Sequence, residues 1–190
     1  QGGSWWLQQV CDSPEELSAL LDRVEERLEN LREFMLPEGW DAERDRLMEM
    51  GIKPGLYRHQ RGPVTFATSI YGVENLIFLL ADDRPLAGRF RDLILRAMLE
   101  RARILDEEAG YTQETAPRGF SFADDNCALL TPEMYEFFGY PILDGVFGRY
   151  APDPGDRRFQ HSDSAMGHIV PILGRLDLTG TNFGPPVMVD

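Results

Sequence analysis

Cysteine is scarce in this sequence, which has only Cys11 and Cys127, far apart along the chain. No C-x-x-C pair is present, so we expect neither a disulfide framework nor a zinc site built from several thiolates. Two isolated cysteines fit a reducing compartment, and we expect a cytoplasmic protein. Long hydrophobic runs are also missing, because no apolar stretch approaches the roughly 20 residues that cross a bilayer. We therefore expect a soluble protein with no membrane partner.

Basic residues are outnumbered, with 19 Lys and Arg against 32 Asp and Glu, and the formal net charge is −13 over 190 residues. Residues 12–49 alone hold 13 acidic and 5 basic side chains. Such a surface repels phosphate backbones, which argues against a nucleic-acid partner. Since 43% of the residues are hydrophobic, the chain can still bury a core, and we expect a single domain over residues 1–190.

The chain starts Gln1-Gly2-Gly3-Ser4, without an initiator methionine or the apolar core of a secretory signal. We expect that Gln1 is not the natural beginning.

Helix and strand patterns alternate along the sequence, without two-residue hairpin signals or internal repeats. This alternation favours parallel β/α units. Four or five units are too few for a closed eight-unit barrel, which takes about 250 residues. Either the last strand lies at an exposed edge or the chain is a piece of a larger barrel. We expect strands at 5–10, 56–69, 119–123, 159–163 and 179–183, and helices at 14–35, 40–50, 72–80, 86–109, from 131 with a break or kink at Pro141, and at 169–176.

Titratable residues gather where two of the expected strands end. His161 and Asp163 are alternate residues of one strand, so their side chains point the same way. Asp124 and Asp125 follow another strand, and the carboxyl ends of parallel strands are where ligands bind. We therefore expect Asp124, Asp125, His161 and Asp163 to converge on one cavity as catalytic residues. The alternative is that His161 and Asp163 only pair with each other or cap the next helix, and that Asp124 and Asp125 form a turn.

Four motifs occur in an order that resembles the uroporphyrinogen decarboxylase superfamily, over roughly residues 13–190. The resemblance implies a (β/α)8 TIM barrel, incomplete in this chain, with a substrate cleft at the carboxyl ends of its strands. It implies two activities, which are decarboxylation of a tetrapyrrole and zinc-dependent methyl transfer to or from a corrinoid. The motifs are Gly62-Pro63-Val64-Thr65-Phe66-Ala67 with Tyr71-Gly72, Phe122-Ala123-Asp124-Asp125, Leu130-Thr131-Pro132-Glu133-Met134-Tyr135-Glu136-Phe137 with Pro141, and His161-Ser162-Asp163.

The resemblance also supplies candidate ligands and partners. Zinc is the one cofactor that it names, and His161 and Asp163 are its candidate ligands, standing where the methyltransferase branch has His-x-Cys. A carboxylate in place of a thiolate makes a harder site. The partner would be a tetrapyrrole, a corrinoid or a corrinoid protein. Candidate substrate contacts are Tyr71, which matches the tyrosine of the family, and Asn126, Ser162 and Asn182. The alternative for Tyr71, and the more common role of a tyrosine, is a packed aromatic with its hydroxyl satisfied.

Three interpretations remain open from the sequence. In the first, the parent protein is an enzyme that acts on a tetrapyrrole or on a corrinoid-linked methyl group. In the second, it is a family member that binds a small anion or a metal without decarboxylation. In the third, the chain is an inactive fragment. An incomplete barrel leaves strand edges unpaired, so we expect a homo-oligomer with contacts at Trp5, Trp6 and the strand that ends at Phe183.

Overall fold

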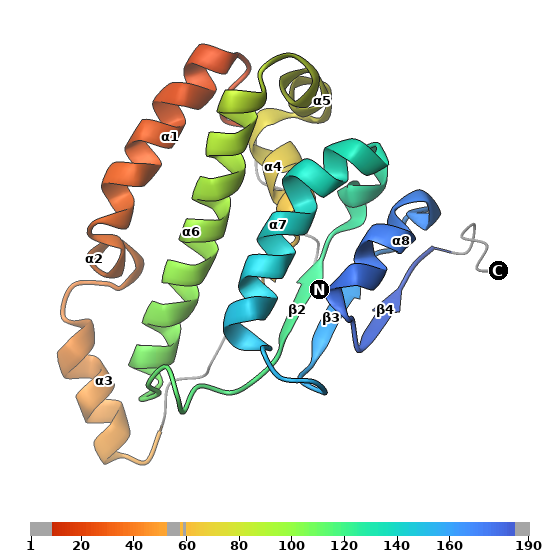
Figure 1. The fold of residues 1–190 in the computed structure, drawn as a ribbon. Helices are drawn as coiled ribbons and strands as arrows, with labels where there is room; N and C mark the ends of the chain where they lie inside the picture. The colour runs from red at the N-terminus through yellow and green to blue at the C-terminus, as the bar shows by residue number, and fades with distance from the viewer. Residues whose placement is uncertain (1–8, 53–57, 59, 185–190) are drawn as a thin grey trace.

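A four-stranded parallel sheet with helices packed beside it forms the protein (Figure 1). The computed structural model describes residues 9–52, 58 and 60–184. Its strands lie side by side in chain order, which confirms the expected mixed α/β class and parallel sheet. The elements are α1 (Pro14–Leu28), α2 (Leu31–Met35), α3 (Trp40–Glu49), β1 (Gln60–Arg61), α4 (Pro63–Tyr71), α5 (Val73–Asp82), α6 (Arg84–Glu108), β2 (Phe120–Ala123), the 3-10 turn η1 (Asp125–Leu129), α7 (Pro132–Tyr150), β3 (Arg158–His161), η2 (Gly167–Ile169), α8 (Val170–Leu173), η3 (Gly174–Leu176) and β4 (Gly180–Asn182).

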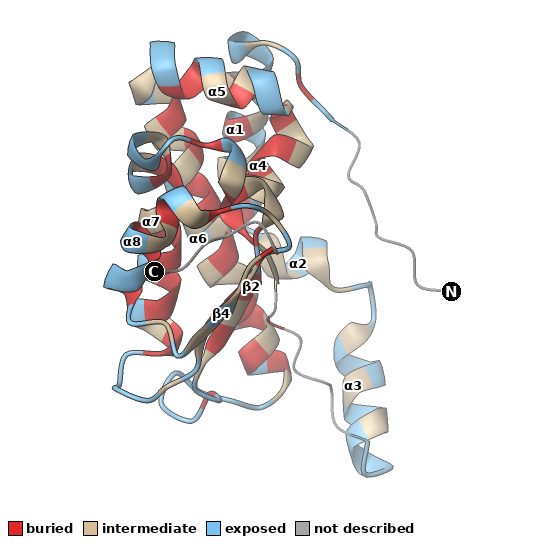
Figure 2. Cartoon of the chain, turned by 90° about the vertical axis from the view of Figure 1, so that its right-hand side faces the viewer, coloured by how far each residue is buried: buried red, intermediate tan, exposed pale blue. Residues whose placement is uncertain are grey.

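The described helices α7 and α8 lie along one side of the sheet (Figure 2). Phe120 and Phe122 of β2 are buried on that side, and their rings contact Tyr150 and Phe147 of α7 at centroid distances of 5.7 and 5.6 Å. Because side chains alternate along a strand, Ser121 and Ala123 point to the opposite side. Both are at least partly exposed, so the described residues leave this second side of the sheet partly open.

The pairing register places the carboxyl ends of β2, β3 and β4 side by side. Ala123 of β2 pairs with His161 of β3, which pairs with Asn182 of β4. The side chains of paired residues on neighbouring parallel strands point to the same side of the sheet. Ala123, His161 and Asn182 therefore form one row of side chains across the sheet. The segments that follow β2 and β3 therefore leave the sheet beside each other.

The first expected strand of this sheet is largely a helix, which corrects the prediction for residues 56–69. β1 is only Gln60–Arg61, and α4 begins at Pro63. Proline suits the first helical position, and the residues that α4 buries recur at helical spacing. The β-branched and aromatic content of this stretch favoured a strand, but the helical burial pattern decides its structure. The buried residues are Pro63, Val64, Ala67, Thr68 and Tyr71.

Two further expectations about helices need correction, one of them in part. The first helix ends at Leu28, and α2 is a separate short helix, where one helix over 14–35 was expected. The helix α7 continues through Pro141, so of the break or kink expected there the break is absent. Proline cannot donate to the carbonyl of Phe137, four residues earlier, and Nη1 of Arg91 donates to that oxygen instead, at 3.2 Å. The expected strand at 5–10 and the contacts at Trp5 and Trp6 fall mainly or wholly outside the described residues.

Within the described ranges, no single helix is both long enough and apolar enough to cross a membrane. The helices α4 and α5 reach that length and composition only as a pair, and they are bent by 104° relative to each other.

Gly62, the residue before α4, allows a close approach that any larger residue would prevent. A Cβ at this position would overlap the Cβ of Asp124. We predict that Gly62→Ala lowers the free energy of unfolding by about 1–3 kcal/mol, the usual range for an overpacked interior. Urea denaturation followed by circular dichroism measures the change.

The matched control is Gly148→Ala, in α7, where an added Cβ meets nothing within 4 Å. Alanine is favoured over glycine inside a helix, so this variant should be as stable as the wild type or more stable by up to about 1 kcal/mol. Equal stabilities for the two variants would contradict the proposed contact between Gly62 and Asp124.

Candidate metal centre

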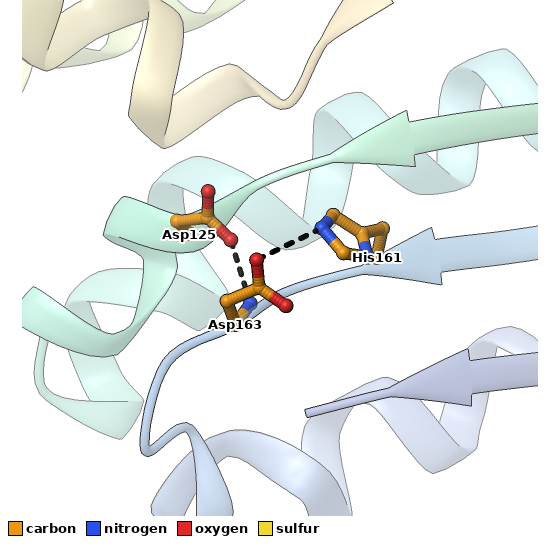
Figure 3. Close-up of side chains that lie close together, drawn as sticks. All are labelled: Asp125, His161 and Asp163. Atoms are coloured by element: carbon orange, nitrogen blue, oxygen red, sulfur yellow. Dashed lines mark hydrogen bonds and ion pairs between the residues drawn. The ribbon is translucent and has the colours of Figure 1, made fainter. Parts of the chain in front are cut away.

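Asp125, His161 and Asp163 lie together at the carboxyl ends of β2 and β3 (Figure 3). One ligand atom from each residue lies within 4.8 Å of the other two. Nε2 of His161 lies 3.5 Å from Oδ2 of Asp163. The side chains of His161 and Asp163 are 40% and 79% exposed, so a solute can reach them.

The ring of His161 is oriented by Asn182 from β4. Nδ1 of His161 lies 2.9 Å from Oδ1 of Asn182. An amide oxygen only accepts hydrogen bonds, so Nδ1 carries the hydrogen and donates it. In the neutral imidazole, Nε2 then has a lone pair and faces the carboxylate of Asp163. A proton on Nε2 or a cation between the two groups removes the repulsion of these two acceptors.

The loops that carry the two aspartates are tied to each other. The backbone N–H of Asp163 donates to Oδ1 of Asp125 at 2.7 Å, and the hydroxyl of Ser164 donates to the backbone oxygen of Asp125. These bonds join the start of η1 to the segment after β3. The carboxylate of Asp163 takes no part in these two bonds, while the carboxylate of Asp125 uses Oδ1 in one of them.

Asp124 does not belong to this cluster, which corrects the prediction that four residues converge. Its side chain is fully buried and accepts hydrogen bonds from the backbone N–H groups of Thr65 at 2.7 Å and Val64 at 3.4 Å. Both donors are in the first turn of α4, whose N–H groups have no partner inside the helix. Burial raises the pKa of Asp124 to about 6, and the hydrogen bonds from Thr65 and Val64 oppose that rise. Asp124 acts as a cap for α4, supplied from 60 residues further along the chain.

Three of the four expected substrate contacts also lie apart from the cluster. The side chain of Tyr71 is in the hydrophobic core, where burial raises the pKa of its hydroxyl. Asn126 binds α4, because its Nδ2 donates to Oγ1 of Thr68 at 2.7 Å.

Ser162 is fully buried, and its hydroxyl accepts from the backbone N–H of Ser164 at 3.1 Å. The fourth expected contact, Asn182, is next to the cluster and holds His161.

The donor set fits a divalent cation. Imidazole nitrogen and carboxylate oxygen both bind zinc, at about 2.0–2.2 Å, and two ligands of one tetrahedral ion are then about 3.4 Å apart. His161 and Asp163 are already near that separation, and the exposed carboxylates can move the remaining distance by rotation about χ1 and χ2. A hydrogen bond to the second ring nitrogen, as from Asn182, is typical of histidine ligands.

The sequence suggested only His161 and Asp163 as metal ligands, and the structure adds Asp125. Its position two residues after β2 was visible in the sequence. That its side chain, rather than that of Asp124, faces His161 depends on the packing of Asp124 against α4, for which the sequence gives no local signal.

No protein-family model matches this chain, and neither the curated proteins nor the solved structures include a match.

The different surroundings of the aspartates lead to a prediction about stability. Asp124→Ala should lower the free energy of unfolding by about 1–3 kcal/mol, because buried N–H groups of α4 lose their acceptor. Asp163→Ala should change it by less than about 0.5 kcal/mol, because that side chain is exposed. Chemical denaturation of both variants at pH 7 without added metal tests this, and a larger loss for Asp163→Ala would refute the assignment.

Proposed function

We propose that this chain is part of a (β/α)8 barrel enzyme of the uroporphyrinogen decarboxylase type, and that Asp125, His161 and Asp163 bind a divalent cation in its substrate cleft. The observation that carries the proposal is the convergence of one imidazole and two carboxylates at the carboxyl ends of neighbouring parallel strands. Barrel enzymes assemble their sites at this end. The sequential order of the four strands, with α7 and α8 along one side, is compatible with half of such a barrel.

Zinc is the cation that we propose. Imidazole suits zinc better than the harder ions magnesium and calcium, and zinc binds to a given site more tightly than manganese does. When bound, zinc lowers the pKa of a coordinated thiol or water, so that a nucleophile is present at neutral pH. Asp125, His161 and Asp163 would hold the ion, and their neighbours orient these ligands: Asn182 sets the ring of His161, and the backbone of Asp163 sets the carboxylate of Asp125.

Of the two activities of the family, we propose methyl transfer to or from a corrinoid. Uroporphyrinogen carries several carboxylates, and the cluster at the ends of β2 and β3 offers carboxylates rather than cationic partners. Like charges brought together raise the free energy of the complex, whereas cationic groups would lower it. A metal-assisted reaction uses the same carboxylates as ligands.

Zinc binding is the first test. We predict that the chain binds zinc in competition with a chromogenic chelator, and that Asn182→Ala weakens the affinity by about 10–100-fold, as removing the partner of a histidine ligand does. His161→Ala and Asp163→Ala should weaken it further, because each removes a ligand.

The controls are His168→Ala and Asp144→Ala. Nε2 of His168 is 2.8 Å from the backbone oxygen of Leu130, and Asp144 is exposed on α7, so neither belongs to the cluster. Unchanged zinc affinity in His161→Ala would rule out the proposed site.

Catalysis and corrinoid binding are the second test. We predict that the purified chain does not decarboxylate uroporphyrinogen above background, with or without zinc, because the ends of β2 and β3 carry acids where carboxylate arms would have to bind. Equilibrium dialysis should show methylcobalamin retained by the zinc-loaded chain. Turnover of uroporphyrinogen would refute the preference for methyl transfer, while leaving the metal site to be judged by the chelator assay.

A further inference from the structure

A groove with an apolar floor runs between the α1–α2 segment and α6, next to β1, and has a volume of about 730 Å³. Figure 1 shows α1 and α2 beside α6 at this place. Its lining includes Leu28 and Leu31 on one side and Ile94 and Met98 on the other. Phe34 is at the rim with 62% of its surface exposed. Ligand pockets in proteins are typically about 300–1,000 Å³ and mainly apolar, so the groove is large enough for a small molecule.

The charge of this groove is opposite to that of the protein. Its lining contains four arginines and no acidic residue, although the chain has a net charge of −13. Most other arginines are paired with acids, as Arg89 is with Asp22 and Glu25. Among the described residues, Arg23 and Arg27 have no such partner, and the guanidinium of Arg27 lies 4.3 Å from the ring centre of Phe34.

The positions of the arginines match a ligand with two parts. Arg23 and Arg27 are exposed and one helical turn apart on α1, so their guanidinium groups are neighbours at the edge of the groove. Guanidinium groups bind carboxylate, sulfonate and phosphate through paired N–H donors. The apolar side chains below them would cover a hydrocarbon body, which has no polar groups to satisfy.

We propose that this groove binds a small anionic amphiphile, which has an apolar body of about ten carbons and one anionic head group. The head group would contact Arg23 and Arg27, and the body would lie along Leu28, Leu31, Ile94 and Met98. The site is separate from the proposed metal centre and does not depend on it. A neutral hydrophobic molecule would lack the contact with the arginines, and a polar anion would lack the contact with the floor.

Displacement of a fluorescent anion tests the proposal on the full chain. The probe is 8-anilinonaphthalene-1-sulfonate, and the competitors are decanoate and decanol, which share a ten-carbon chain and differ in head-group charge. Decanoate should displace the probe at a concentration at least about ten-fold lower than decanol, because a charge-assisted hydrogen bond adds about that much affinity. Equal potency would overturn the role of the arginines.

Variants of the lining residues test whether the ligand binds in the groove. The double variant Arg23→Glu with Arg27→Glu should weaken decanoate binding at least ten-fold, and Ala97→Trp should weaken both competitors by filling the floor. The matched control is Arg84→Glu with Arg175→Glu, which reverses two exposed charges elsewhere and should leave binding unchanged. Thermal unfolding of each variant establishes that it folds. Unchanged binding in the first double variant would overturn the proposal.

A second copy of the chain is the competing occupant. Sedimentation of the wild type and of Ala97→Trp distinguishes the two cases. A dimer that dissociates in the variant or on addition of decanol would show that the groove is an interface between chains and would overturn the proposal. A molecular mass that is the same in both proteins supports the small-molecule site.

Discussion

The carboxylate of Asp124 is the contact on which the arrangement of the strand ends depends. Its side chain accepts from the first turn of α4, and its backbone N–H donates to the carbonyl of His161 at 2.9 Å. One residue thus joins α4, β2 and β3. The close approach requires glycine at position 62. A buried acid with a pKa near 6 carries a cost in desolvation, which the hydrogen bonds from α4 offset in part. With Asp124 turned inward, Asp125 is directed toward His161.

The sequence predicts an element well where local patterns and packing agree. Strands β2, β3 and β4 were placed within a few residues, because short apolar or alternating runs there end at turn residues. The strand prediction for the residues of α4 was wrong. Their β-branched side chains indicated a strand, while Pro63 and a cap from Asp124 favour a helix. The cap comes from a distant residue, so no window of local sequence contains it. The same holds for Pro141, where Arg91 takes the freed carbonyl.

The sequence predicted where the candidate site lies, but not all of the residues that belong to it. The sequence placed titratable groups after two strands, and parallel pairing in register brings them to one level. Which of two consecutive aspartates faces His161 depends on side-chain packing, and so does the role of Asn182 as its hydrogen-bond partner. Asn182 was expected to contact a substrate. The register pairs Asn182 with His161, and the packing of the two side chains then sets the hydrogen bond between them.

The two proposed sites lie near each other and carry opposite charges. Arg61, which lines the groove, pairs with Ala123, and Ala123 pairs with His161, so the groove meets the same row of the sheet as the metal centre. Strands are about 4.8 Å apart, which places the backbones of Arg61 and His161 roughly 10 Å from each other. Anions are favoured at the arginine end of this row and cations at the carboxylate end. A ligand with an anionic group would therefore be drawn to the groove side, while the carboxylates remain available for a metal ion.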